Sequence, residues 1–196
     1  MKDINLFKTE SSIYLKEVSS KSQVSKSDDC DGYLIRASEK EARRIVDSLK
    51  GSNKIIAVWG GDDSFNRRVV ETMKIDYLVS PESGEKKDNL KQRDSGLNHV
   101  VAKEASKKKI AIVVSMSGVS SLEGKGLAVR LSRIIQNIKI CRRAKCEIKI
   151  ASFGKNKNEV FDVLGRSSFG TSLGMSSQQV KGAVGFFQPK TIKKLE

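Results

Sequence analysis

The sequence has few of the residues on which most catalytic and metal sites depend. It contains one histidine, His99, and three cysteines, Cys30, Cys141 and Cys146, without a Cys-x-x-Cys pair. Zinc sites and metal-dependent hydrolases need several imidazole or thiolate ligands close together, so the sequence indicates neither. The odd number of cysteines also argues against a disulfide framework and favours buried thiols in a reducing compartment.

Long apolar runs, leader segments and phosphate-binding loops are missing too. No run approaches the roughly 18 apolar residues of a membrane span, and the N-terminus has no long apolar segment or small-residue cleavage site. A cytoplasmic protein without membrane contact is therefore expected. Gly60-Gly61-Asp62-Asp63 matches no dinucleotide fingerprint and is interpreted as a turn, and neither a P-loop nor a Gly-x-Ser-x-Gly elbow occurs.

Acidic residues are outnumbered by basic ones, and unevenly along the chain. The net charge is +14 and the pI is about 9.7. Residues 125–157 hold ten Lys and Arg against one acidic residue, whereas residues 1–75 hold fourteen against twelve. Such asymmetry favours a phosphate backbone as partner, and the alternative is a solubility charge on solvated faces. Aromatic residues are only 6% and do not alternate with basic ones, so stacking on single-stranded bases is not the expected mode.

Apolar runs alternate with amphipathic segments along the 196 residues. Strands are expected at 4–7, 13–15, 33–35, 54–59, 75–79, 110–114, 148–152 and, last, 169–173. Helices are expected at 38–49, 62–73, 95–107, 122–144, 156–164 and from 176, with a final helical turn from 188. The alternation predicts one domain over 1–196 with a parallel sheet and right-handed crossovers, and it leaves open a doubly wound sheet or a barrel. Residues 19–29 are expected to form an exposed loop, and 118–125 a flexible one.

Side chains that could cap these helices are visible in the sequence. Ser38 with Glu41, and Ser120 with Glu123, have the spacing of a capping box. Asp94 or Ser95 is expected to cap the helix after it. In that helix the apolar face is predicted to be Leu97, Val100 and Val101.

The stretch from Ile75 to Ser115 has a specific pattern. Asp76-Tyr77-Leu78-Val79-Ser80-Pro81 is followed by Arg93-Asp94-Ser95-Gly96-Leu97-Asn98-His99-Val100-Val101-Ala102-Lys103, a lysine-rich turn and an Ile/Val strand. This stretch resembles the protein component 3 family, the TIM-barrel-like subunit of archaeal ribonuclease P that is related to a eukaryotic barrel subunit. A looser resemblance continues to about Gly174, and Ser95 stands where the family often has proline.

The resemblance implies the fold and the function. The fold would be α/β, a TIM-barrel-like parallel βα barrel related to the PHP phosphoesterases, with an incomplete set of units. The protein would be a non-catalytic subunit of the ribonucleoprotein endonuclease that removes the 5′ leader from precursor tRNA, supporting the folding and activity of the catalytic RNA. It would bind no cofactor, since the RNA component uses Mg²⁺. The implied partners are ribonuclease P RNA, a small α/β protein subunit in a heterotetramer, other protein subunits and, indirectly, precursor tRNA.

Candidate RNA contacts come from the matched block and from charge. The block supplies Arg93, His99, Lys103, Lys107 and Lys108, and charge alone adds Arg67, Arg68, Lys86, Lys87, Lys91, Arg142, Arg143 and Lys155. Asp94, Ser95 and Asn98 are expected to fix the loop. For each lysine the alternative is a solvated side chain, and for His99 a structural hydrogen bond. No catalytic or metal-binding residue is assigned.

Two other functions stay open. One is a generic basic RNA-binding protein whose similarity extends only to the fold. The other is a stand-alone PHP-like metal-dependent phosphoesterase, for which a single histidine is a poor ligand supply. A magnesium site made of carboxylates alone is possible in principle, and its ligands would come from Asp31, Asp62, Asp63, Asp76 and Glu82.

Overall fold

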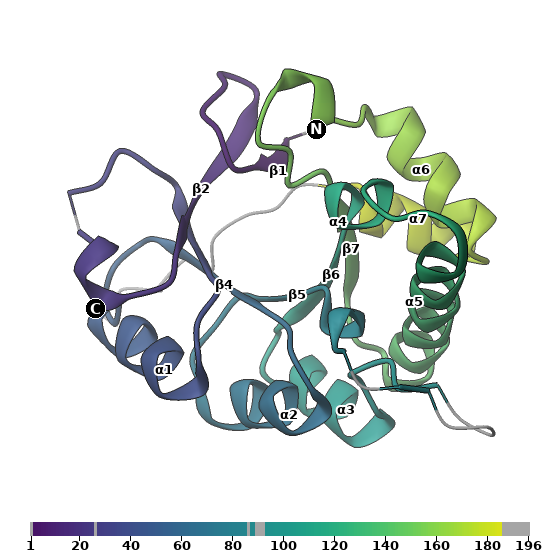
Figure 1. Ribbon diagram of the computed structural model, residues 1–196, viewed down its shortest axis with the longest axis horizontal. Coiled ribbons are helices and arrows are strands. Elements are labelled where there is room, and N and C mark those ends of the chain that lie inside the picture. Colours follow the sequence, from purple (N-terminus) through teal and green to yellow (C-terminus); the bar gives the residue numbers. More distant parts are fainter. Residues whose placement is uncertain (1, 26, 86, 89–92, 186–196) are drawn as a thin grey trace.

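The computed structural model describes residues 2–25, 27–85, 87–88 and 93–185, and in these residues seven parallel strands form one curved sheet (Figure 1). The strand order in the sheet follows the order in the chain, and each neighbouring pair is parallel. The strands are β1 (Asp3–Asn5), β2 (Ser12–Val18), β3 (Gly32–Ile35), β4 (Ile55–Trp59), β5 (Tyr77–Val79), β6 (Ala111–Ser115) and β7 (Ile148–Ala151).

The sheet curls until its two edges meet. The backbone N–H of Phe153, two residues beyond β7, donates to the carbonyl of Ile4 in β1 at 2.8 Å, and the N–H of Leu6 donates to Gly154 at 2.9 Å. The seam is therefore closed by the segment that follows β7. This nearly closed seven-stranded arrangement confirms the TIM-barrel-like fold and answers the question that alternation left open, since a doubly wound sheet has two free edges.

The helices lie outside the barrel (Figure 1). They are α1 (Glu39–Ser48), α2 (Asp63–Thr72), α3 (His99–Lys107), α4 (Met116–Ser120), α5 (Gly124–Ala144), α6 (Val163–Ser172) and α7 (Ser177–Ala183), with short 3₁₀ turns η1 (Lys21–Gln23), η2 (Pro81–Ser83) and η3 (Lys157–Glu159). The first two connections differ from the rest, because only η1 and irregular chain link β1, β2 and β3. No helix in the described ranges is long and apolar enough to cross a bilayer.

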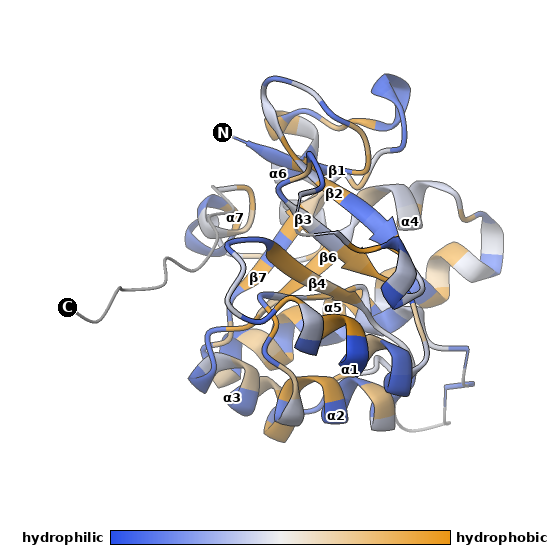
Figure 2. Ribbon diagram, turned by 90° about the vertical axis from the view of Figure 1, so that its left-hand side faces the viewer, coloured by the Kyte–Doolittle hydropathy of each residue, from blue (hydrophilic) through white to orange (hydrophobic). Residues whose placement is uncertain are grey.

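The core has two layers, one inside the barrel and one between the barrel and its helices. Along β4, Ile55 and Ala57 belong to the inner layer, whereas Ile56 and Val58 belong to the outer one. Both faces of the strand are thus buried, which explains the continuous apolar run in the sequence. Figure 2 shows apolar residues gathered in strands such as β4 and β6 in the middle, and helices in which polar and apolar residues alternate. The three cysteines are free, and Cys141 and Cys146 are buried.

Three of the predicted elements were wrong. Residues 169–172, expected to begin a last strand, are the end of α6, a helix capped by Asp162, whose Oδ1 accepts the N–H of Gly165 at 2.6 Å. A run of five residues is too short for its period to separate strand from helix. The expected helix over 156–164 is instead η3 followed by the start of α6, and the expected loop over 118–125 contains the end of α4 and the start of α5. The turn expected from 188 lies outside the described residues.

Polar side chains cap several of the helices, although not through the two capping boxes that the sequence predicts. Asp62 caps α2 by accepting the N–H of Phe65 at 2.7 Å, and Ser176 caps α7 in a capping box with Gln179. The two other boxes are not formed. Ser38 makes no side-chain cap bond, and Glu123, the N-cap residue of α5, makes none either.

The start of α3 also differs from its prediction. Its cap is Asn98, whose Oδ1 accepts the N–H of Val101 at 2.9 Å, so neither Asp94 nor Ser95 caps the helix. Val100 is 67% exposed and is not part of the apolar face, which consists of Val101, Ala102 and Ala105, with Leu97 buried just before the helix. The helix therefore begins later than its hydrophobic spacing suggested.

Candidate nucleic-acid interface and barrel mouth

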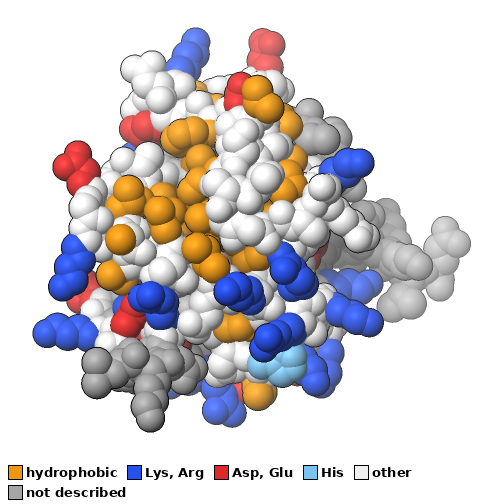
Figure 3. All heavy atoms as spheres, turned by 90° about the vertical axis from the view of Figure 1, so that its right-hand side faces the viewer, with side chains coloured by type: hydrophobic (Ala, Val, Ile, Leu, Met, Phe, Trp, Pro, Cys, Tyr) orange, Lys and Arg blue, Asp and Glu red, His pale blue; other side chains and the backbone are white. Residues whose placement is uncertain are grey.

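The candidate RNA contacts lie on two sides of the barrel. Arg67 and Arg68 lie on α2, His99, Lys103, Lys107 and Lys108 lie on α3, Arg142 and Arg143 end α5, Lys87 and Arg93 lie between η2 and α3, and Lys155 follows β7. Lys86 and Lys91 lie outside the described residues. Figure 3 shows basic side chains gathered over the lower half of one face, around the pale blue histidine, with apolar side chains above them.

Some of these cations are engaged by the protein itself. The Nζ of Lys108 donates to the carbonyl of Val70 at 3.1 Å and also to that of Glu71, so it binds the C-terminal end of α2. The guanidinium of Arg142 donates to the carbonyl of Gly174 at 2.6 Å, beyond the end of α6. Both side chains satisfy helix-end carbonyls that would otherwise lack donors.

Other candidates are exposed. Lys107 is 76% exposed and lies 3.7 Å from Glu104, a weak surface pair. Lys103, Arg143 and His99 are exposed as well. Arg67 and Arg68 pair with Glu71 and Glu39 at 2.7 and 2.5 Å, with both arginine side chains about half exposed. The exposed cations of α3 and α5 are therefore the best placed to meet a phosphate backbone.

The segment between β5 and α3 is held by α5. The guanidinium of Arg133, a buried residue, pairs with Asp88 at 2.8 Å and donates to the carbonyl of Gly84 at 2.7 Å. Further along α5, the amide of Gln136 donates to the Oγ of Ser95 at 3.0 Å, and that of Asn137 donates to the Ser95 carbonyl at 3.0 Å. Three polar residues on one helix thus fix both ends of this segment.

A residue of α2 holds the same segment from the other side. The fully buried Asn66 donates its amide to the carbonyl of Gly96 at 2.9 Å and accepts the N–H of Gly61 at 2.8 Å. Gly96 has φ +67°, and a Cβ there would lie 1.9 Å from the carbonyl oxygen of Pro81. Only glycine fits this close contact.

The residues expected to fix this loop have distinct partners. The Oγ of Ser95 donates to the carbonyl of Leu97 at 3.3 Å, and Asn98 caps α3. The N–H of Asp94 donates to the Oδ1 of Asp88 at 2.9 Å. Sequence reasoning missed Asn66, Arg133, Gln136 and Asn137. Their only signal was a polar residue at a helix position that faces the core.

Glu82 is fully buried just beyond β5. Neither of its carboxylate oxygens makes a hydrogen bond to a residue that the structure describes, and burial raises its pKa to about 7. The charge of Arg130 and the polar groups of Ser80 and Asn137 oppose this shift without cancelling it. The carboxyl group is therefore poised between its two protonation states near neutral pH.

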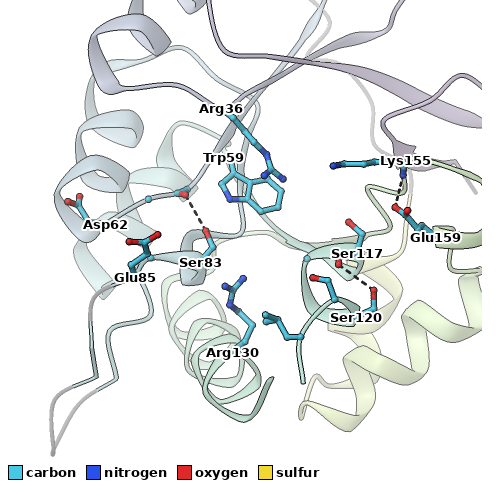
Figure 4. Close-up of a pocket in the computed structure, with 16 residues that line it drawn as sticks. Arg36, Trp59, Asp62, Ser83, Glu85, Ser117, Ser120, Arg130, Lys155 and Glu159 are labelled. Carbon is cyan, nitrogen blue, oxygen red and sulfur yellow. Dashed lines mark hydrogen bonds between the residues drawn. The ribbon is translucent and has the colours of Figure 1, made fainter. Parts of the chain in front are cut away.

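The carboxyl ends of the strands surround an open cavity of about 1270 Å³ (Figure 4). Its cationic lining residues are Arg36, Arg130 and Lys155, and its acidic ones are Asp62, Glu85 and Glu159. The guanidinium carbon of Arg36 lies 3.5 Å from the centre of the Trp59 ring, and Phe153 meets that ring edge-on at 6.4 Å and 87°. Among the described RNA-contact candidates, Lys155 alone lines this mouth.

The carboxylates considered for magnesium are dispersed. Asp31 and Asp76 accept backbone N–H groups of Tyr14 and Ile56 near the amino ends of strands, whereas Asp62 and Glu82 lie at the carboxyl ends. Within the ranges that the structure describes, no group of three or more His, Cys, Asp or Glu residues is arranged to hold a metal ion.

A parallel barrel with its cavity at the carboxyl ends of the strands is the architecture of the TIM-barrel-like hydrolases and their relatives. Solved structures agree: an amidohydrolase aligns with 79% of this chain and 41% of its own, at TM-score 0.54 and 13% identity. A chain of a cryo-EM structure of archaeal ribonuclease P with mature tRNA aligns more fully, with 93% of this chain and 86% of its own, at TM-score 0.71 and 21% identity. These likenesses show the fold.

Sequence comparison finds relatives that share one description. Ribonuclease P protein component 3 of Methanocaldococcus jannaschii is 29% identical over 123 residues, covering 63% of this chain and 50% of that protein. The same component of Methanothermobacter thermautotrophicus is 30% identical over 109 residues, covering 55% of this chain and 40% of that protein. The component of Methanosarcina mazei is 22% identical over 161 residues, covering 82% of this chain and 64% of that protein. The resemblance to archaeal ribonuclease P protein component 3 is thereby confirmed. No family model matches, and the chain spans about half the length of the first of these relatives.

Proposed function

We propose that this chain works as a non-catalytic protein subunit of ribonuclease P, the ribonucleoprotein that removes the 5′ leader from precursor tRNA. The observation that carries the proposal is the repeated match to component 3 proteins from several archaea, over 50 to 82% of this chain. The catalytic RNA supplies the phosphodiester chemistry with its Mg²⁺ ions, and the protein binds no cofactor of its own.

The protein's physical role is to neutralise RNA phosphates. The net charge is +14, and exposed cations such as Lys103 and Lys107 on α3 and Arg143 on α5 lie where the fold leaves them free to contact a backbone. Each phosphate contact releases condensed counterions, so the protein lowers the Mg²⁺ concentration at which the RNA reaches its active fold. Loops and helix ends rich in Lys and Arg are suited to contact the phosphate backbone of a folded RNA and to recognise its shape.

The partners that we propose for this chain are those that the resemblance implies. They are ribonuclease P RNA, a small α/β protein subunit that pairs with this one in a heterotetramer, and the other protein subunits of the cytoplasmic enzyme. Precursor tRNA is met indirectly, through the assembled particle. The exposed apolar side chains at the start of α6 are candidates for the protein contacts: Val160, Val163 and Leu164.

The test is cleavage of precursor tRNA at limiting Mg²⁺ by ribonuclease P RNA with the small partner subunit, with and without this chain. Stimulation that requires the RNA supports the proposal. Absence of stimulation would favour the generic RNA-binding alternative. The chain alone, with Mg²⁺ or Mn²⁺, is the control for the phosphoesterase alternative, and hydrolysis in that arm would contradict a non-catalytic role.

A further inference from the structure

The mouth of the barrel combines an aromatic platform with positive charge. Arg36 follows β3 and Trp59 ends β4, and the register of the two strands pairs the preceding residues, Ile35 and Val58. Arg36 and Trp59 therefore stand side by side, with the guanidinium 3.5 Å above the ring. Glu17 of β2 pairs with the same guanidinium, with its Oε1 3.2 Å from the Arg36 Nε. The ion pair and the ring contact together fix the position of the guanidinium.

Two further cations face the cavity from other parts of the chain. Arg130 projects from α5 and Lys155 from the loop after β7, and both side chains point inward from opposite sides in Figure 4. No described residue makes a hydrogen bond or an ion pair within 4 Å with either cationic group, although Glu82 lies close enough to Arg130 to influence its pKa. Burial, together with the charge of Arg133, lowers the pKa of Arg130, and the charge of Glu82 opposes this shift without cancelling it.

Two of the three acidic lining residues are engaged by neighbouring groups, and the third is the exposed Glu85. Asp62 caps α2 through the N–H of Phe65, and its side chain points away from the cavity in Figure 4. Glu159 accepts the backbone N–H of Lys155 at 2.9 Å and the amide of Asn156 at 2.6 Å, so its oxygens serve its own loop. Asp62 and Glu159 therefore form no ion pair with Arg130 or Lys155 among the described residues.

We propose that the barrel mouth binds one nucleotide, with its base stacked on the Arg36–Trp59 pair and its phosphate held by Lys155 and Arg130. Bases stack on aromatic rings and on guanidinium planes, and lysine and arginine are the usual phosphate donors. A cavity of about 1270 Å³ has room for a nucleotide. The nucleotide is either a free mononucleotide or an unpaired nucleotide of an RNA. The site stands apart from the basic surface of α3 and does not rest on the proposed function.

Intrinsic fluorescence reports this site directly, because Trp59 is the chain's single tryptophan. The full chain is titrated with AMP and UMP, with adenosine and inorganic phosphate as half-ligands, and with a single-stranded tetranucleotide; calorimetry provides a second readout. We expect the mononucleotides to quench the fluorescence in a saturable way. Each half-ligand should bind more weakly than the mononucleotides, and phosphate should compete with them. Lys155→Ala should weaken binding about tenfold, whereas Lys157→Ala, two residues along the same exposed loop but outside the lining, should leave it unchanged.

The arms separate the two sources of the nucleotide. Mononucleotide binding as tight as tetranucleotide binding, with the same dependence on Lys155, identifies a free mononucleotide. Tetranucleotide binding that is tenfold tighter and still depends on Lys155 identifies an unpaired nucleotide of RNA. Two results together would overturn the proposal. Mononucleotides at millimolar concentration would cause neither quenching of the Trp59 fluorescence nor a heat of binding, and Lys155→Ala and Lys157→Ala would weaken tetranucleotide binding equally. Arg36→Gln, which removes the platform cation, should weaken adenosine binding more than phosphate binding.

Discussion

Arg133 of α5 and Asp88 of the segment after β5 form a close ion pair, with Nη2 2.8 Å from Oδ1 and side chains only 6% and 17% exposed. The same guanidinium donates to the carbonyls of Gly84 at 2.7 Å and Glu82 at 3.3 Å. Although burial opposes it, the N–H of Asp94 and the nearby guanidinium of Arg133 lower the pKa of Asp88. One arginine thus ties the segment that carries the most specific sequence pattern to the longest helix.

Arg133→Ala is expected to destabilise the protein by about 3 kcal/mol, because it leaves a partly buried carboxylate and two carbonyls without their donor. Urea unfolding followed by circular dichroism measures the change. Arg143→Ala, an exposed arginine ten residues along the same helix, is the matched control and should shift the free energy of unfolding by less than about 0.5 kcal/mol. Equal effects of the two substitutions would show that the pair does not hold the segment.

Gly96→Ala should prevent stable folding or lower the free energy of unfolding by more than about 3 kcal/mol. Its φ of +67° lies in the left-handed region, and the new Cβ would fall 1.9 Å from the Pro81 carbonyl oxygen, which the buried Asn66 fixes. Gly126→Ala is the control, since nothing lies within 4 Å of a Cβ in the first turns of α5. There the same change should stabilise by about 0.5–1 kcal/mol. Thermal melting of both variants gives the comparison, and a folded Gly96→Ala protein with an unchanged melting temperature would contradict the steric argument.

The strands could be predicted from the sequence because they are covered on both faces. Runs such as Ile110 to Val114 are apolar at every position, and this signal does not depend on distant parts of the chain. Caps made by near neighbours, such as Asp62 on Phe65, are local as well. Where a local pattern had two solutions, as in residues 169–173, the sequence offered no way to choose between them.

The supports of the site could not be predicted, because they depend on how distant elements meet. Arg133 and Asp88 are 45 residues apart, and Asn66 and Gly96 are 30 apart. Arg36 and Trp59 come together only through the register of β3 on β4. A sequence shows that these side chains are polar or aromatic, whereas their contacts depend on strand register and helix rotation, which periodicity does not fix.

The lysines of α3 are expected to separate into two kinds. The double substitution Lys103→Ala and Lys107→Ala should reduce the slope of log affinity for RNA against log salt concentration by about 2, because each phosphate contact contributes about one unit. It should not change the stability of the fold, because both side chains are exposed. Lys108→Ala should instead lower the free energy of unfolding by about 1 kcal/mol, since its Nζ holds the end of α2. Filter binding from low to moderate salt measures the first effect, and urea unfolding measures the second. An unchanged salt slope would remove Lys103 and Lys107 from the RNA-binding surface.

Glu82 should make stability fall as pH rises. Its pKa is about 7 in the folded protein against 4.5 ordinarily, because burial penalises the ionised form. Between these two pH values the folded state keeps a proton that the unfolded chain has released, so the free energy of unfolding falls by at most about 3 kcal/mol from pH 4.5 to pH 7 and then levels off. Glu82→Gln cannot titrate and should remove most of this slope, becoming the more stable protein above pH 7. Glu85→Gln, an exposed neighbour with the same change of charge, should keep the wild-type slope. Urea unfolding at several pH values from 5 to 8 distinguishes them, and parallel curves for the wild type and Glu82→Gln would show that Glu82 is already ionised throughout this range.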